Sequence, residues 1–235
     1  MRVLRGPDEK ARVSRAQRRS GTNPFARPDP SLRVGDVSST HVCLLNKFPA
    51  LDDHLLIVTR SWAEQEARLD GSDFEALFAC LAEGEALGFY NRGSVAGASQ
   101  PHKHLQIVRL PLGDGPARIP IEPLLRDAVP DHGVGAAPGL PFVHALARTP
   151  AGASAAHALY AELREAVGDS AGGYNLLVTP RWTLLVPRVR SSWQGIAVNA
   201  LGFAGALLVR NRERLERLRR LGPLTLLQRV SSSER

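Results

Sequence analysis

The sequence predicts an α+β domain in which helices pack against antiparallel strand pairs. Residues 40–46 and 54–59 are rich in apolar and β-branched side chains and are joined by a short connection, which is typical of two paired, buried strands. Residues 174–186 repeat this pattern, and helical periodicity lies between the two pairs. The composition, 43% hydrophobic and 23% charged residues in a chain of 235, is that of a globular protein with a sizeable core.

The first helix is expected to begin at Ser72. Ser72 and Glu75 have the spacing of a capping box, in which each side chain bonds to the other residue's backbone N–H. The apolar side chains that follow recur at helical spacing and are therefore expected on one buried face. These side chains are Phe74, Leu77, Phe78 and Leu81.

The next segment, residues 90–101, is expected to be a turn, because it is rich in small residues. It leads into a predicted strand over residues 102–110. Residues 111–150 are rich in Pro and Gly and have little periodicity, which predicts a long surface connection or a cover over an active site.

The second half of the chain repeats the mixture of helices and strands. A helix is expected at about residues 155–167, ending at Gly168. Residues 174–178 and 182–186 form a predicted hairpin. A short strand near residues 206–209 and a helix over residues 211–221, closed by Gly222 and Pro223, complete the predicted elements.

The net charge of +7 is unevenly distributed. Residues 1–20 contain seven Lys or Arg and two Asp or Glu, so we expect residues 1–22 to form a flexible basic arm. A second basic cluster, residues 210–220, also contains Glu213 and Glu216, as a solvated helix face does. Neither cluster contains interleaved aromatic residues for base stacking. We therefore expect anionic small molecules rather than nucleic acids as partners.

The chain is expected to be cytoplasmic and not associated with a membrane. No stretch approaches the roughly 18 consecutive apolar residues of a membrane span, and the N-terminus lacks the apolar core of a secretory signal. Its two cysteines, Cys43 and Cys80, are too far apart for a CxxC motif and are interpreted as buried thiols in a reducing compartment.

The candidate catalytic motif is the pentapeptide at residues 102–106. In an extended strand alternate side chains share a face, so His102, His104 and Gln106 are expected to project together toward a cleft. Neutral imidazole can act as a nucleophile toward phosphorus. The small residues just before the strand can bring backbone N–H groups close to an anion, and Lys47 and Asn91 are expected to act beside them.

An HxH pair can also be half of a metal site. The other histidines are scattered along the sequence, and no cluster of cysteines or carboxylates completes a ligand set. We therefore expect no metal site, and we interpret the remaining histidines as surface or core residues: His41, His54, His132, His144 and His157.

Four segments, LNKFP, DHLLIVTR, YNRGSVAGASQPHKHLQ and YNLLVTPRWTLLVPR, together resemble the ATP adenylyltransferase, or diadenosine tetraphosphate (Ap4A) phosphorylase, family of the histidine-triad superfamily. The resemblance extends from about Asn23 to Gln228. It implies an antiparallel sheet with packed helices, similar to histidine-triad (HIT) proteins and hexose-1-phosphate uridylyltransferases (GalT-like), and a C-terminal extension that completes the site. The N-terminal part with the catalytic motif would be residues 23–150, and the C-terminal part residues 151–228.

The resemblance implies reversible nucleotidyl transfer, in which Ap4A and phosphate give ATP and ADP. His104 would be the nucleophile that carries the nucleotide, and His102 would orient it. Gln106 stands where the hydrolytic branch has a third histidine, and its neutral amide can bind phosphate oxygens without titrating near pH 7. The enzymatic alternatives are a hexose-1-phosphate uridylyltransferase and a dinucleoside polyphosphate hydrolase. The non-enzymatic alternative is a protein that binds nucleotides or RNA without turnover.

Further contacts follow from the matching motifs. The resemblance places phosphates beside Lys47, the nucleotide beside Asn91, and the α-phosphate region beside Gly97, Ala98, Ser99 and Gln100. It adds a C-terminal group of Asn199, Ala200, Leu201, Ala206 and Arg210. In this group the asparagine matches the fungal members, whereas the four residues after it differ from theirs. No tightly bound cofactor is expected, and any Mg²⁺ is expected to arrive with the nucleotide.

Overall fold

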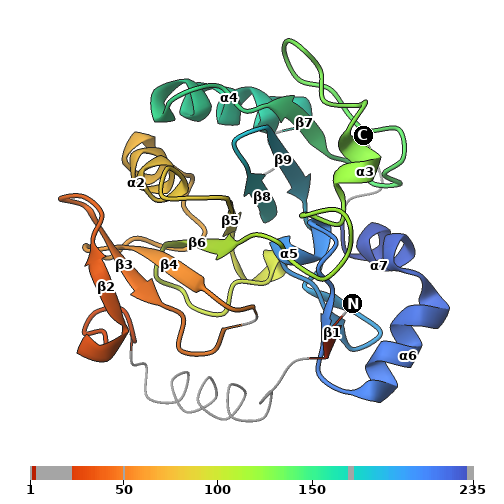
Figure 1. Cartoon of the computed structure of the whole chain (residues 1–235), viewed down its shortest axis with the longest axis horizontal. Helices are drawn as coiled ribbons and strands as arrows, with labels where there is room; N and C mark the ends of the chain where they lie inside the picture. The colour runs from red at the N-terminus through yellow and green to blue at the C-terminus, as the bar shows by residue number, and fades with distance from the viewer. Residues whose placement is uncertain (1, 4–22, 50, 169–171, 232–235) are drawn as a thin grey trace.

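A computed structural model of the chain describes residues 2–3, 23–49, 51–168 and 172–231. An eight-stranded sheet, in the order β2-β3-β4-β6-β5-β8-β9-β7, runs through the molecule, and every neighbouring pair in it is antiparallel (Figure 1). This confirms the predicted fold class. The strands are β2 Arg33–Asp36, β3 His41–Leu45, β4 His54–Thr59, β5 Ala86–Asn91, β6 His104–Arg109, β7 Ala145–Arg148, β8 Tyr174–Val178 and β9 Trp182–Pro187.

The strand pairs predicted from the sequence are confirmed, and one central strand is new. β3 pairs with β4, and β8 pairs with β9. The prediction for residues 90–101 was wrong at its start, because Tyr90 and Asn91 belong to β5, which lies between β6 and β8. All six residues of β5 are buried. A strand that is covered on both faces lacks the polar alternation by which strands are recognised.

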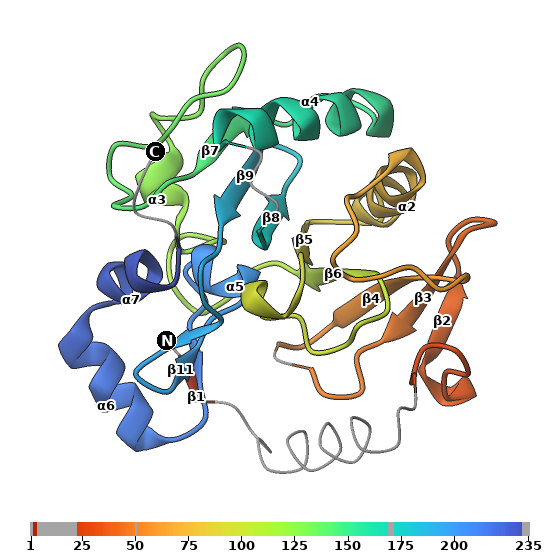
Figure 2. The same cartoon turned by 180° about the vertical axis from the view of Figure 1, so that it is seen from behind.

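Two helices cover one face of the sheet. α2, Gly71–Leu81, and α4, Ala153–Ala166, lie side by side over it (Figure 2). Leu105 and Ile107 of β6 pack on this side with the apolar face of α2. The helix α2 is capped by Asp70 and Asp73 rather than by Ser72 and Glu75. The Asp70 carboxylate accepts from two backbone N–H groups, which places the capping box two residues earlier than predicted.

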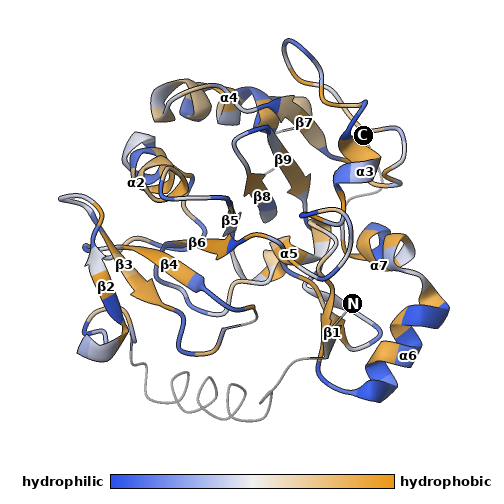
Figure 3. Ribbon diagram, viewed as in Figure 1, coloured by the Kyte–Doolittle hydropathy of each residue, from blue (hydrophilic) through white to orange (hydrophobic). Residues whose placement is uncertain are grey.

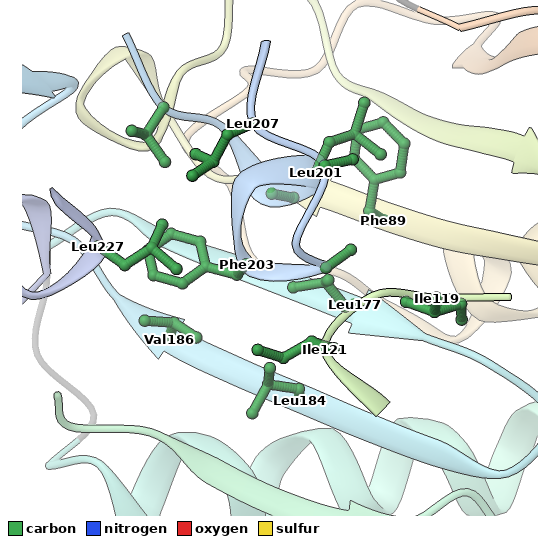
Figure 4. Packing of buried hydrophobic residues seen from close by; sticks show 14 of the residues in the cluster. Phe89, Ile119, Ile121, Leu177, Leu184, Val186, Leu201, Phe203, Leu207 and Leu227 are labelled. Atoms are coloured by element: carbon green, nitrogen blue, oxygen red, sulfur yellow. The ribbon is translucent and has the colours of Figure 1, made fainter. Parts of the chain in front are cut away.

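The opposite face is covered over β5, β8 and β9 by two segments that are far apart in the sequence (Figure 4). Ile119 and Ile121 come from residues 111–150, a stretch that also contains α3, Glu122–Leu125, and β7. They belong to the same hydrophobic cluster as Leu201 and Phe203 of α5, Ala200–Phe203. The prediction of a surface connection was therefore wrong, because isolated apolar residues in this stretch are anchored in the core despite its lack of periodicity.

The C-terminal region adds small elements around α5. The hairpin of β10, Ser192–Trp193, and β11, Ile196–Ala197, precedes α5, and β12, Leu208–Val209, follows it. The predicted last helix is confirmed as α6, Arg212–Leu221, in which hydrophilic and hydrophobic residues are interleaved (Figure 3). A further helix, α7, Pro223–Val230, was missed, because Gly222 and Pro223 were interpreted only as a stop signal.

The first residues of the chain contradict part of the predicted flexible arm. Arg2 and Val3 form β1, which pairs in parallel with β12. Residues 4–22, the rest of the predicted arm, lie outside the described residues. Within the described part of the chain, no helix has both the length and the apolar character that crossing a membrane would require.

Candidate active site

A cavity of about 320 Å³ lies over the part of the sheet that α5 leaves uncovered. Its floor is formed by the faces of β3, β4 and β6 that point away from α2, and Phe25 and Leu32 also line it. Eight of the site residues predicted from the sequence line it: Lys47, Asn91, Gly97, Ser99, Gln100, His104, Gln106 and Asn199. The predicted alternation holds within β6, since His104 and Gln106 line the cavity while Leu105 and Ile107 face α2. The prediction was wrong for His102, which precedes β6 and does not line the cavity.

The imidazole of His104 is held in one tautomer. Its Nδ1 lies 2.8 Å from the backbone carbonyl oxygen of His102. A carbonyl oxygen only accepts, so Nδ1 carries the proton and the lone pair of the neutral ring is on Nε2. The ring of Phe25 lies beside it, with the centroids 5.1 Å apart. A buried imidazole with its lone pair on Nε2 is suited to attack an electrophile in the cavity.

His102 does not line the cavity and instead supports the strand beneath it. Asn23 donates from Nδ2 to His102 Nδ1 at 2.9 Å, because the other end of the Asn23 amide accepts from the Phe25 N–H. His102 therefore carries its proton on Nε2 and donates it to Thr59 Oγ1, at 2.9 Å. Burial lowers the pKa of His102 below its usual value, so the neutral form is favoured.

This lowered pKa predicts a pH dependence of stability. Below about pH 6.5 the unfolded chain binds a proton at His102, whereas in the folded protein His102 stays neutral to lower pH. The free energy of unfolding therefore decreases as the pH is lowered. We expect a smaller loss between pH 7 and pH 5 in His102→Gln, which cannot titrate. Urea unfolding of both proteins at the two pH values measures the difference. Equal losses in the two proteins would contradict this assignment of His102.

Gln106 is oriented by a histidine that the sequence reasoning set aside. The Nε2 atom of His54 lies 2.9 Å from Gln106 Oε1. Because an amide oxygen only accepts, Nε2 of His54 must be the donor. With its oxygen bound in this way, the Gln106 amide presents its NH₂ group to a ligand oxygen. Strand alternation places His54 on the face of Leu56, but only the antiparallel register of β4 and β6 brings it to Gln106.

Two backbone N–H groups of the predicted cradle are used within the turn before β6. Gly97 N–H donates to Ser94 O, and Ala98 N–H donates to Gly93 O, so the turn itself uses both groups. Ala98 does not line the cavity. Gly97 has a φ of 96°, and a Cβ there would lie 2.9 Å from Val198 O and from Asn199 Cβ. Glycine is needed at this position so that the C-terminal segment can close against the turn.

A buried network joins Asn91 to the C-terminal region. Asn91 Oδ1 accepts from Asn175 Nδ2 at 2.8 Å and from the Ala200 backbone N–H at 2.9 Å. Asn175 in turn accepts from the guanidinium of Arg188, which is 4% exposed. Burial lowers the pKa of Arg188 to about 9, so it stays protonated at neutral pH. The network fixes the Asn91 amide with its NH₂ group as the remaining donor.

Only the first residue of the predicted C-terminal group reaches the cavity. Asn199 lines it, whereas the side chains of Ala200, Leu201 and Ala206 are packed in the core. Arg210 is exposed and does not line the cavity. None of these four residues therefore lines the cavity. The reason is that α5 is a single buried turn whose side chains fill the sheet face beside the cavity.

Two charged residues that line the cavity, Arg27 and Asp29, were not recognised from the sequence. Arg27 lines the cavity together with Lys47, and both are exposed. Lys103, between the two histidines, points the other way, with Nζ 2.7 Å from Asp73 Oδ2. In the described ranges, no three His, Cys, Asp or Glu side chains gather closely enough to hold a metal ion.

Comparison with known proteins gives consistent matches along the chain. Residues 1–127 match the family model of the Ap4A phosphorylase N-terminal domain, and residues 138–233 match that of the ATP adenylyltransferase C-terminal domain. Diadenosine 5',5'''-P1,P4-tetraphosphate phosphorylase 2 of Saccharomyces cerevisiae is 29% identical over 238 residues, covering 83% of this chain and 71% of the yeast protein. Protein APA1 of the same yeast is 33% identical over 109 residues, 41% of this chain and 34% of that protein.

Solved structures agree with these sequence matches. The crystal structure of yeast Ap4A phosphorylase Apa2 has a TM-score of 0.71 and 29% identity, over 87% of this chain and 78% of the yeast chain. Its complex with Ap4A has a TM-score of 0.75 and 26% identity, over 89% and 80%. Its complex with AMP has a TM-score of 0.74 and 29% identity, over 88% and 80%.

Proposed function

This chain belongs to the Ap4A phosphorylase and ATP adenylyltransferase family, and on that basis we propose that it converts Ap4A and phosphate reversibly into ATP and ADP. It is an enzyme of the nucleotidyltransferase type, and its ligands are nucleotides. The observation that carries the proposal is the His104 tautomer, with Nδ1–H donated to the His102 carbonyl and the lone pair on Nε2 in a cavity.

The first step transfers AMP to the protein. His104 Nε2 forms a bond to the α-phosphorus of Ap4A, while the bond from that phosphorus to the bridging oxygen breaks and ATP leaves with the electron pair. Nδ1–H keeps its bond to the His102 carbonyl, which stabilises the positive charge that develops on the ring. The NH₂ groups of Gln106 and Asn91 are assigned to phosphate oxygens, because both side chains line the cavity and their amide oxygens already accept hydrogen bonds from the protein.

The second step regenerates the free imidazole of His104. An oxygen of inorganic phosphate attacks the phosphorus of the AMP adduct, the N–P bond breaks, and its electron pair returns to Nε2 as ADP leaves. Lys47 and Arg27 supply positive charge for the leaving polyphosphate and for the incoming phosphate. Gln106 favours this transfer over hydrolysis, because a neutral amide does not serve as a general base for water.

Phosphate dependence tests the proposal. We expect purified protein to degrade Ap4A to ATP and ADP only when phosphate is present, and to make little AMP. Equal degradation with and without phosphate would identify a hydrolase instead. Turnover of UDP-hexose with a hexose-1-phosphate, in place of Ap4A, would favour the uridylyltransferase alternative.

Mg²⁺ is proposed to enter with the nucleotide rather than to reside in the protein, and the same assay covers this point. After treatment with EDTA, we expect addition of Mg²⁺ with the substrate to restore full activity at once.

A cytoplasmic location is proposed as well, and it is supported by the two free thiols, Cys43 and Cys80, which are typical of a reducing compartment.

A further inference from the structure

We propose that Gln65 is a positioning residue for the nucleophile, and that its side-chain amide sets the separation between His104 and Asn91. Gln65 lies between β4 and α2, is 2% exposed and does not line the cavity. The inference rests on the proposed function, because it concerns the geometry from which His104 attacks phosphorus.

The ladder between β5 and β6 stops short of the site. Its pairs run from Ala86 opposite Arg109 to Phe89 opposite Gln106. If the same antiparallel register continued, Tyr90 would lie opposite Leu105 and Asn91 directly opposite His104. The two strands separate before that point, although His104 stays paired with Val58 of β4 and Asn91 with Asn175 of β8. The sheet is therefore split between the nucleophile and the nucleotide-binding asparagine.

The amide of Gln65 fills this split. Its Oε1 accepts from the His104 backbone N–H at 2.8 Å. Its Nε2 donates to the Asn91 carbonyl oxygen at 2.9 Å and to the His104 carbonyl oxygen at 3.2 Å. One side chain thus takes the place of the missing rung, since it satisfies the two groups that would otherwise bond to each other.

The backbone of Gln65 is itself held at several points. Its N–H donates to Pro101 O at 2.7 Å, and its carbonyl accepts from the Tyr90 hydroxyl at 2.6 Å and from the Gly93 N–H at 3.2 Å. These contacts tie it to both ends of the turn over residues 93–101. The amide is therefore a fixed spacer rather than an adaptable contact.

This arrangement bears on the reaction because the His104 ring follows its backbone. Nδ1–H bonds to the His102 carbonyl, so a shift of the chain at residues 102–104 turns Nε2. Asn91 in turn holds the Ala200 N–H and so the C-terminal wall of the site. A displacement of about 1 Å between a nucleophile and a bound substrate can cost about 100-fold in rate.

Two variants of similar size test the proposal, Gln65→Met, which removes all three hydrogen bonds, and Gln65→Glu, which removes the two that Nε2 donates. We measure the single-turnover rate of the AMP adduct with Ap4A by intact mass, and the dissociation constant for AMP by calorimetry. We expect the adduct rate to fall by about 10- to 100-fold in both variants, with AMP affinity within about threefold of the wild type.

Matched controls separate positioning from folding. Thr183→Val removes a buried hydrogen bond to Thr149 at the far edge of the sheet and should leave the adduct rate unchanged. Tyr90→Phe keeps the aromatic ring in the core but removes the hydrogen bond from the Tyr90 hydroxyl to the Gln65 carbonyl. It replaces the Gln65 variants as the test if they fail to fold, and its adduct rate should fall by about 3- to 10-fold.

The outcomes are distinguishable. An adduct that forms at the wild-type rate in a folded Gln65 variant, or in Tyr90→Phe, would overturn the inference. So would AMP affinity that falls in parallel with the rate, because Gln65 would then act on binding. If the wild-type protein itself formed no adduct, the proposed function would fail instead.

Discussion

Replacing His104 by alanine is expected to lower phosphate-dependent turnover of Ap4A by at least about 10⁴-fold and to eliminate the AMP adduct. Nε2 of His104 is the atom whose lone pair the hydrogen bond to the His102 carbonyl directs into the cavity. Without it, phosphate would have to attack Ap4A directly, with no covalent intermediate. Steady-state assays and intact mass after rapid acid quench measure the two effects.

His132→Ala is the matched control, because His132 is exposed and does not line the cavity. Its turnover and adduct should equal those of the wild type. An AMP adduct that persists in His104→Ala would assign the nucleophile to another residue. A folded variant, judged by an unchanged urea midpoint, is required for either conclusion.

Replacing Arg188 by methionine is expected to lower the free energy of unfolding by about 3–5 kcal/mol. The guanidinium donates to the carbonyls of Val198 at 3.1 Å, Arg190 at 2.7 Å, Val230 at 3.1 Å and Ala96 at 3.3 Å, and to the Asn175 side chain. Methionine would leave several of these oxygens buried without a donor. Urea unfolding at pH 7 measures the loss.

Activity should fall together with stability in Arg188→Met, because Asn175 and then Asn91 depend on the same network. Arg190→Met provides the control, since its exposed guanidinium stacks on Trp193 rather than entering the core. We expect it to change the free energy of unfolding by less than about 0.5 kcal/mol. A loss below about 1 kcal/mol in Arg188→Met would show that water or neighbouring donors replace the guanidinium.

The local parts of the fold could be predicted because they depend on neighbouring residues. The hairpin of β8 and β9, the strands β3 and β4, and the helix α6 with its Asn211 cap all follow from patterns within about ten residues. The strand β5 and the packing of residues 111–150 could not be predicted. Their burial is imposed by partners from distant parts of the chain rather than by a periodic pattern of their own.

The catalytic motif shows the same division. The alternation of His104 and Gln106 with Leu105 and Ile107 is a property of any extended strand, so the sequence alone determined which side chains share the site face. The resemblance in the same segments identified the family, and both family models bear this out.

The tertiary structure alone decided how those side chains are held. Gln106 is oriented by His54, 52 residues away, and the Asn91 side chain bonds to the backbone of Ala200, 109 residues away. The tertiary structure also places the side chains of Ala200, Leu201 and Ala206 in the hydrophobic core. Such contacts depend on strand register and on the packing of distant segments, and neither is encoded in the spacing of neighbouring residues.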